Sequence, residues 1–161
     1  MRIPSVNSRG LTRGFSLVEL MVAVLILGLL LAMAAPGFAR YMRSWRLNGQ
    51  ANEMAATLRL ARAAAVSKNT TVLFVFDVSN GEYFYFEDDD ESGSPGGGEY
   101  QSGLHEFAPG INIDSFSMGQ QWITFGPKGN TVDGGSIILE NQEHGSRRIR
   151  VFSGTGNITV D

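Results

Sequence analysis

Hydrophobic and polar positions follow three patterns along the chain. Residues 15–35 are apolar or small throughout, with Glu19 as the one ionisable side chain. Residues 37–67 carry apolar side chains every three or four positions, which is the period of an amphipathic helix. From residue 70 onward, β-branched and aromatic runs alternate with turn residues, as strands do. These patterns predict one long helix from about residue 16 to 67 and then a mostly antiparallel β domain, an α+β fold.

The first apolar run is long enough to cross a membrane. As a helix, residues 15–35 would extend about 31 Å at roughly 1.5 Å per residue, close to the hydrocarbon thickness of a bilayer. Three arginines, Arg2, Arg9 and Arg13, precede the run, which favours a cytoplasmic N-terminus. A carboxylate inside such a segment is costly, so Glu19 is a candidate functional residue.

Two other interpretations of this run remain open. A secretory signal would end in small residues and be removed, and Ala32, Met33 and Ala34 resemble such a cleavage site. However, the run is longer than a usual signal core, and helical pattern resumes directly after Pro36. A plain single-span anchor is the second alternative. Pro36 lacks an amide hydrogen and is therefore expected to kink or locally open the helix.

The second half of the predicted helix has an apolar stripe and several arginines. The stripe comprises Phe38, Tyr41, Met42, Trp45, Met54, Leu58, Ala61 and Ala65. Arg59 and Arg62 fall largely on other faces of the helix. Arg40, Arg43 and Arg46 follow the apolar run closely, so we interpret them as a solvated or headgroup-contacting face.

Short strands account for most of the chain after residue 69. Asn80 and Gly81 mark a hairpin turn between the first two strands, because both residue types tolerate positive φ. The predicted strands cover residues 70–77, 83–86, 111–116, 121–125, 136–140, 147–152 and 157–160. Glycine-rich segments separate several of them.

An acidic run at residues 87–91 opens a glycine-rich segment that we predict to be an exposed loop. Carboxylates suit Ca²⁺, which prefers hard oxygen ligands. The spacing does not match an EF-hand loop, however, and charge runs are usually solvated. We therefore predict no metal site and no cofactor.

Composition narrows the possible functions. The formal net charge is −3, and removal of the three N-terminal arginines would bring it to −6, which argues against broad charge-driven binding of nucleic acid. The chain has no cysteine, so it has no disulfide or thiolate chemistry. His105 and His144 lack metal-ligand spacing, and residues 153–156 are not a phosphate loop because no lysine follows. We expect no enzymatic activity.

One basic group could contact phosphates without reading bases. Arg148 and Arg150 share one face of a predicted strand, and Arg147, Lys128 and His144 could be adjacent. The alternative is an ordinary solvated strand face, or salt bridges to some of the 16 acidic residues.

The N-terminal residues G-F-S-L-V-E-L at 14–20 resemble the class III signal of type IV pilins and type II secretion pseudopilins. The resemblance implies cleavage between Gly14 and Phe15 by a prepilin peptidase and N-methylation of Phe15. It also implies that Glu19, at the fifth mature position, guides assembly by neutralising the new α-amino group of a neighbouring subunit. Pro36, the twenty-second mature residue, is where pilins commonly bend.

The second half of the chain resembles the GspH/FimT-type minor pseudopilins. The similarity lies in I-T-F-G-P-K-G at 123–129, G-G-S-I-I-L at 134–139, the hairpin at 148–156 and L-R-L-A-R at 58–62. It implies a type IV pilin-like fold with four segments. These are a leader peptide (1–14), a transmembrane or filament-core helix (15–36), an amphipathic helix half (37–68) and a β-rich globular domain (69–161).

Two functions follow from this resemblance. One is a minor pseudopilin near the tip of a type II secretion pseudopilus, which primes assembly and aids protein export. The other is a FimT/FimU-like minor pilin of a type IV pilus, in pilus assembly or DNA uptake. DNA-binding members carry G-R-x-R where residues 156–159 read G-N-I-T, so DNA is not an expected partner.

The resemblance also implies where the protein acts. The expected partners are other pilins or pseudopilins, the inner-membrane assembly platform, the peptidase and exported proteins. The expected location is the bacterial inner membrane, as a single-pass protein with its C-terminal domain in the periplasm.

Overall fold

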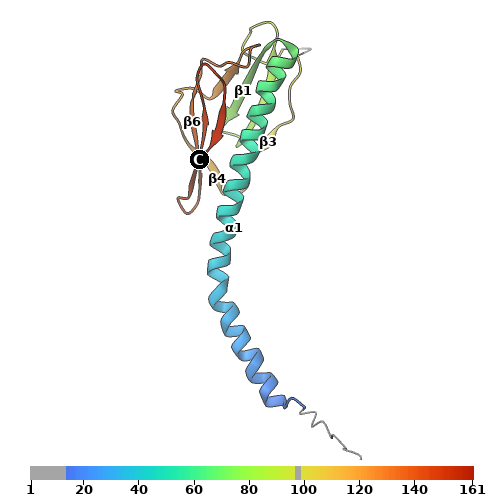
Figure 1. Ribbon diagram of the computed structural model, residues 1–161, viewed down its shortest axis with the longest axis vertical. Coiled ribbons are helices and arrows are strands. Elements are labelled where there is room, and N and C mark those ends of the chain that lie inside the picture. Colours follow the sequence, from blue (N-terminus) through green and yellow to red (C-terminus); the bar gives the residue numbers. More distant parts are fainter. Residues whose placement is uncertain (1–13, 97–98) are drawn as a thin grey trace, which may run out of the picture. The chain divides into compact units, whose positions relative to one another are not determined.

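The computed structural model describes residues 14–96 and 99–161 and divides into two units, Met1–Arg40 and Tyr41–Asp161. One helix, α1 (Leu17–Lys68), contributes residues to both units (Figure 1). It begins and ends within one residue of the predicted bounds. The helix also continues across position 36, so the opening expected at Pro36 does not interrupt it. A proline removes a single helical hydrogen bond, and the neighbouring turns can hold the helix together.

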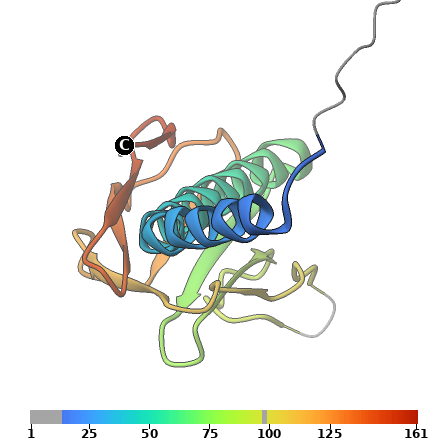
Figure 2. The same cartoon turned by 90° about the horizontal axis from the view of Figure 1, so that it is seen from below.

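The second unit contains two antiparallel four-stranded sheets (Figures 1 and 2). The first has the order β3-β2-β1-β5, and the second the order β4-β6-β7-β8. The strands are β1 (Thr71–Asp77), β2 (Glu82–Asp88), β3 (His105–Glu106), β4 (Ile111–Phe116), β5 (Trp122–Phe125), β6 (Gly135–Asn141), β7 (Ser146–Val151) and β8 (Ile158–Val160). The α+β class and the antiparallel pairing predicted from the sequence are confirmed.

Both sheets and the second half of α1 share one hydrophobic core. The helix contributes small and aliphatic side chains, of which Leu58 is fully buried. The first sheet adds Phe74 and Tyr83, whose rings stack with centroids 5.7 Å apart, and the second sheet adds Ile137 and Ile149. The helix residues in this core are Leu47, Ala51, Met54, Ala55, Leu58, Ala61 and Ala65.

The aromatic residues expected at the start of the helix stripe are not part of this core. Phe38, Tyr41 and Trp45 are all exposed. A helix turns about 100° per residue, so the nine residues from Trp45 to Met54 place these two side chains on opposite sides of α1. The stripe predicted from the sequence therefore combines residues from two different faces of α1. The face that packs in the core begins at Leu47.

The acidic segment is only partly a loop. Glu87 and Asp88 belong to β2 and are buried, contrary to the expectation of an exposed run. Glu87 is held by an ion pair, with its Oε1 atom 2.7 Å from Lys68 Nζ. Asp88 accepts the backbone N–H of Gly93. The short strand β3, which pairs Tyr83 with His105, was not predicted.

Candidate functional site

Glu19 lies in the first turn of α1, five residues after the Gly14 of the predicted cleavage position. Ser16 caps the helix, because its Oγ accepts the backbone N–H of Glu19 at 3.2 Å. Ser16 and Glu19 thus have the S-x-x-E spacing of a capping box, a signal that our sequence reasoning missed. A carboxylate in the first turn is stabilised by the positive end of the helix dipole. Residues 14–16 are not helical, so the Gly14–Phe15 bond lies outside the regular helix.

The first unit presents apolar side chains outward. Among its described side chains, residues 14–35 and 37–40 are all exposed. Leu17, Leu25 and Met33 each leave more than two thirds of their surface accessible. By length and composition, α1 is long and apolar enough to cross a membrane. An exposed apolar surface of this extent is typical of segments that lie in lipid or pack against another apolar surface.

The second unit has an uncharged stripe along the outer side of α1. At about 100° per residue these positions fall within one narrow sector of the helix. The exposed residues of this outer stripe are Trp45, Gly49, Asn52, Ala56, Leu60, Ala63 and Ser67. Small and apolar residues at this spacing allow a neighbouring helix to approach closely.

The four basic residues proposed as one patch are separated in the structure. Arg148 and Arg150 share the outer face of β7, as predicted, and Arg150 pairs with Asp161 at 3.3 Å. Arg147 points the other way, because side chains alternate along a strand, and its Nε donates to Asn48 of α1. His144 lies in the β6–β7 turn and pairs with Glu140.

Lys128 lies at the other end of the domain from Arg147. The next residue, Gly129, accepts a hydrogen bond from Arg62, whereas Arg147 reaches Asn48. These two helix positions are fourteen residues apart, which corresponds to roughly 21 Å. Lys128 and Arg147 therefore do not lie side by side, and Arg147 faces away from the Arg148–Arg150 pair, so these residues do not form the single patch that we expected.

Two arginines expected on other faces of α1 instead connect the helix to the loops. Arg62 donates from Nε to the carbonyl of Gly129 at 2.8 Å and from Nη2 to the carbonyl of Thr155 at 3.1 Å. Arg59 donates from Nη2 to the carbonyl of Ile158 at 3.1 Å. These bonds fix the β5–β6 loop and the β7–β8 turn against the helix.

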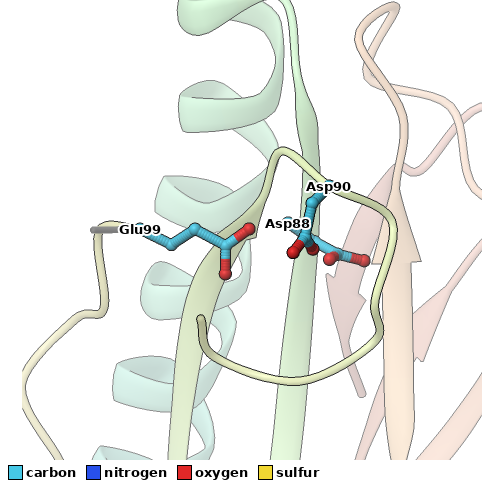
Figure 3. Close-up of side chains that lie close together, drawn as sticks. All are labelled: Asp88, Asp90 and Glu99. Atoms are coloured by element: carbon cyan, nitrogen blue, oxygen red, sulfur yellow. The ribbon is translucent and has the colours of Figure 1, made fainter. Parts of the chain in front are cut away.

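Three carboxylates gather where the acidic loop leaves β2. Asp88, Asp90 and Glu99 each place an oxygen within 4.8 Å of the others (Figure 3). Each also accepts a backbone N–H, from Gly93, Ser92 and Gly96 respectively. The bonds from Ser92 lower the pKa of Asp90. These local hydrogen bonds explain why the three carboxylates lie close together without a metal ion. The absence of a metal site stays a prediction.

One buried polar network joins α1 to the first sheet. Gln50 Nε2 donates to Tyr83 Oη at 3.3 Å, and Gln50 Oε1 accepts the N–H of Ala108 at 2.8 Å. The His105 ring stacks on Tyr83, and its Nδ1 is 3.7 Å from Glu53. Burial, with a contribution from Glu53, raises the pKa of Tyr83 to about 12. These residues fix the helix in register on the sheet.

Two known protein-family models together match most of the chain. Residues 50–156 match the family model of the type II transport protein GspH. The chain belongs to the GspH family. Residues 9–35 match the prokaryotic N-terminal methylation motif, which covers the capped helix start and the exposed apolar helix. A search among curated proteins found no match.

Solved structures place the GspH-family chain in the pseudopilin and pilin fold. The minor pseudopilin EpsH of the Vibrio cholerae type 2 secretion system is 11% identical, with a TM-score of 0.57 over 72% of this chain and 96% of that one. The type IV minor pilin FimU of Pseudomonas aeruginosa is 21% identical, with a TM-score of 0.58 over 71% of this chain and 87% of that one. At these identities the likeness shows the fold.

The resemblance stated from the sequence is therefore confirmed at the level of family and fold. GspH-family members are structural pseudopilins or pilins that assemble with other pseudopilins or pilins. The methylation motif and the apolar helix are those of a membrane-anchored, pilin-like protein.

Proposed function

We propose that this chain is a minor pseudopilin of a type II secretion system, a structural subunit near the pseudopilus tip that primes assembly and aids protein export. The observation that carries the proposal is the exposed apolar half of α1, which is attached to a separately folded GspH-family domain. A helix of this kind can be held in a membrane and later packed among like helices without refolding the domain.

Glu19 guides incorporation in this proposal. Cleavage between Gly14 and Phe15 creates an α-amino group one residue before the helix cap. That positive charge lies at the positive end of the helix dipole, where it is unfavourable. The carboxylate of Glu19 on a neighbouring subunit can neutralise it. Pairing lets both charges enter an apolar environment in which either one alone would be strongly disfavoured.

The domain contributes specific lateral contacts. The outer stripe of α1 defined above is uncharged and exposed, which supports side-by-side packing on other pilin-like subunits. The inner-membrane assembly platform and exported proteins are further partners in this proposal. We assign no catalytic role, no cofactor and no DNA contact to the chain. The globular domain lies in the periplasm, and Pro36 lies at the end of the filament-core helix.

Processing provides a direct test. The intact mass of protein extracted from membranes should correspond to loss of residues 1–14 plus one methyl group on Phe15. Substitution of Gly14 by a bulky residue should leave the full-length mass. An unprocessed N-terminus in a strain with an active prepilin peptidase would refute the proposal in favour of a plain membrane anchor.

A gene deletion distinguishes a role in a type II secretion system from a role in a type IV pilus. The deletion strain should be scored for exoprotein secretion, twitching motility and DNA uptake, with the wild-type gene restored as control. Loss of secretion alone is the expected result. Loss of motility or uptake with normal secretion would contradict the assignment to a type II system and indicate a type IV minor pilin. Arg148 and Arg150 would then be the next residues to substitute.

A further inference from the structure

A small cavity between α1 and two turns of the second unit contains an excess of positive charge. Its volume is about 190 Å³. Its lining comes from three parts of the chain that are distant in sequence. The lining residues are Arg43 and Arg46 of α1, Pro109, Gly110 and Ile111 at the start of β4, and Asn141 and Gln142 at the end of β6.

The two arginines are three positions apart, so they lie on the same side of the helix. Like charges at this spacing repel and slightly destabilise the helix unless an anion offsets them. Arg43 has such a partner, because its Nη2 lies 2.6 Å from Glu143 Oε1 in the β6–β7 turn. Within residues 14–96 and 99–161, no carboxylate lies within ion-pair distance of Arg46. One positive charge of the cavity is thus left without an acidic partner.

A third arginine adds to the positive charge nearby. Arg147 donates to Asn48, two residues along α1 from Arg46, although it does not line the cavity. The lining also includes Gln142, whose side-chain amide can donate hydrogen bonds. Guanidinium groups from α1 and a side-chain amide after β6 are therefore both among the donors that line the cavity.

We propose that this cavity binds a phosphate group through Arg43 and Arg46. Guanidinium forks match the oxygens of phosphate, often in bidentate pairs. A phosphate can also accept hydrogen bonds from an amide donor such as that of Gln142. The phosphate can belong to a lipid headgroup or to a free ion, since both present the same chemistry to the cavity. The site is separate from the cleavage and assembly residues and does not depend on which filament the protein serves.

The first experiment uses inorganic phosphate as the probe. The full chain is dissolved in micelles of a maltoside detergent, which contains no phosphate, and its thermal unfolding midpoint is followed against phosphate concentration at constant ionic strength. A ligand that binds only the folded state raises the midpoint. Arg46→Gln should weaken phosphate binding about tenfold, and the Arg43→Gln/Arg46→Gln double variant should abolish the shift. Arg40→Gln carries the same charge change on the same helix outside the cavity and should respond like wild type.

A second variant changes binding in the opposite direction. Glu143→Gln removes the carboxylate that competes for Arg43, so it should bind phosphate several-fold more tightly. General destabilisation could not produce this gain. Circular dichroism and the midpoint without phosphate show whether each variant folds.

A third measurement distinguishes the two sources of phosphate. Nanodiscs with equal phosphatidylglycerol and phosphatidylcholine are dissolved, and the lipids retained by the protein are counted by native mass spectrometry. Phosphatidylglycerol retained by wild type and lost in the double variant supports a lipid headgroup. A midpoint shift with inorganic phosphate, but no lipid preference, supports a free phosphate ligand. If the double variant matches wild type in both measurements, the proposal is wrong.

Discussion

A pair of leucines on α1 gives a sharp test of which helix face belongs to the domain. Leu58 is 0% exposed and Leu60 is 59% exposed, two residues along the same helix. Leu58→Ala removes about three buried carbon groups, worth roughly 0.8 kcal/mol each in transfer free energy. The cavity left behind adds to this, so the free energy of unfolding should fall by about 3 kcal/mol. Leu60→Ala should change it by about 0.5 kcal/mol or less.

The assay is urea unfolding of the full chain in detergent micelles, followed by near-ultraviolet circular dichroism. The two variants share the same residue change and the same helix propensities, so their difference isolates burial. Leu58→Ala should lower the urea midpoint without changing the denaturant dependence. Leu60 belongs to the outer stripe, so Leu60→Ala should keep its stability and instead lower recovery of the subunit in sheared filaments.

An equal loss of stability in the two variants would refute the reasoning, because it would mean that both faces of α1 are buried within one subunit. A stable Leu58→Ala variant would refute it as well. Normal filament recovery of Leu60→Ala would leave the core assignment intact and contradict the role of the outer stripe.

Three further predictions concern single residues. Burial raises the pKa of Tyr83 to about 12, so its contribution to stability is complete below pH 10 and is lost as pH rises toward 12, by up to about 3 kcal/mol. Tyr83→Phe should flatten this part of the stability profile, measured by urea unfolding at pH 8 and pH 11.5. Gly156→Ala would place its Cβ 2.3 Å from the Gly129 carbonyl oxygen, whereas Gly154→Ala meets nothing within 4 Å, and both have positive φ. Gly154→Ala should lower the free energy of unfolding by about 1 kcal/mol through backbone strain alone. Gly156→Ala should lower it by more, and its thermal midpoint should therefore fall further than that of Gly154→Ala. Equal midpoints for the two variants would contradict the close contact between residue 156 and the Gly129 carbonyl. Glu19→Ala should leave membrane insertion intact but impair incorporation into filaments, as judged by immunoblots of sheared fractions. Glu19→Gln distinguishes loss of the charge from loss of the side chain's size.

The arrangement of elements was largely predictable because local signals were strong. The apolar run indicates where α1 starts, and β-branched runs between turn residues determine most strands. The S-x-x-E cap marks the same helix start, although our sequence reasoning missed it. The division into two sheets was not predictable, because a period of two indicates which face of a strand is buried but not which strand pairs with it. The two-residue strand β3 is too short to leave a pattern.

The basic residues show the same limit for the candidate sites. Alternation along β7 correctly placed Arg148 and Arg150 on one face. It could not show that Arg147 donates a hydrogen bond to Asn48 of α1. Nor could it show that Arg43 and Arg46 line a cavity with residues at the β6–β7 turn. Both contacts join residues nearly a hundred positions apart in the sequence. The expectation of an exposed loop at Glu87 is wrong for the same reason. Its ion-pair partner, Lys68, lies at the end of α1, and the sequence pattern does not show that the two residues meet.

The bonds from Arg59 and Arg62 have a consequence for how this domain can diversify. Their acceptors are backbone carbonyls of Gly129, Thr155 and Ile158, and every amino acid supplies a carbonyl. Side chains in these loops can therefore change without removing the bonds that hold the loops to the helix. Gly129 and Gly156 are exceptions, because both have positive φ. A Cβ would lie 3.0 Å from the Val66 side chain at Gly129 and 2.3 Å from the Gly129 carbonyl oxygen at Gly156. A subunit built in this way can acquire new neighbours through surface substitutions while its scaffold stays the same.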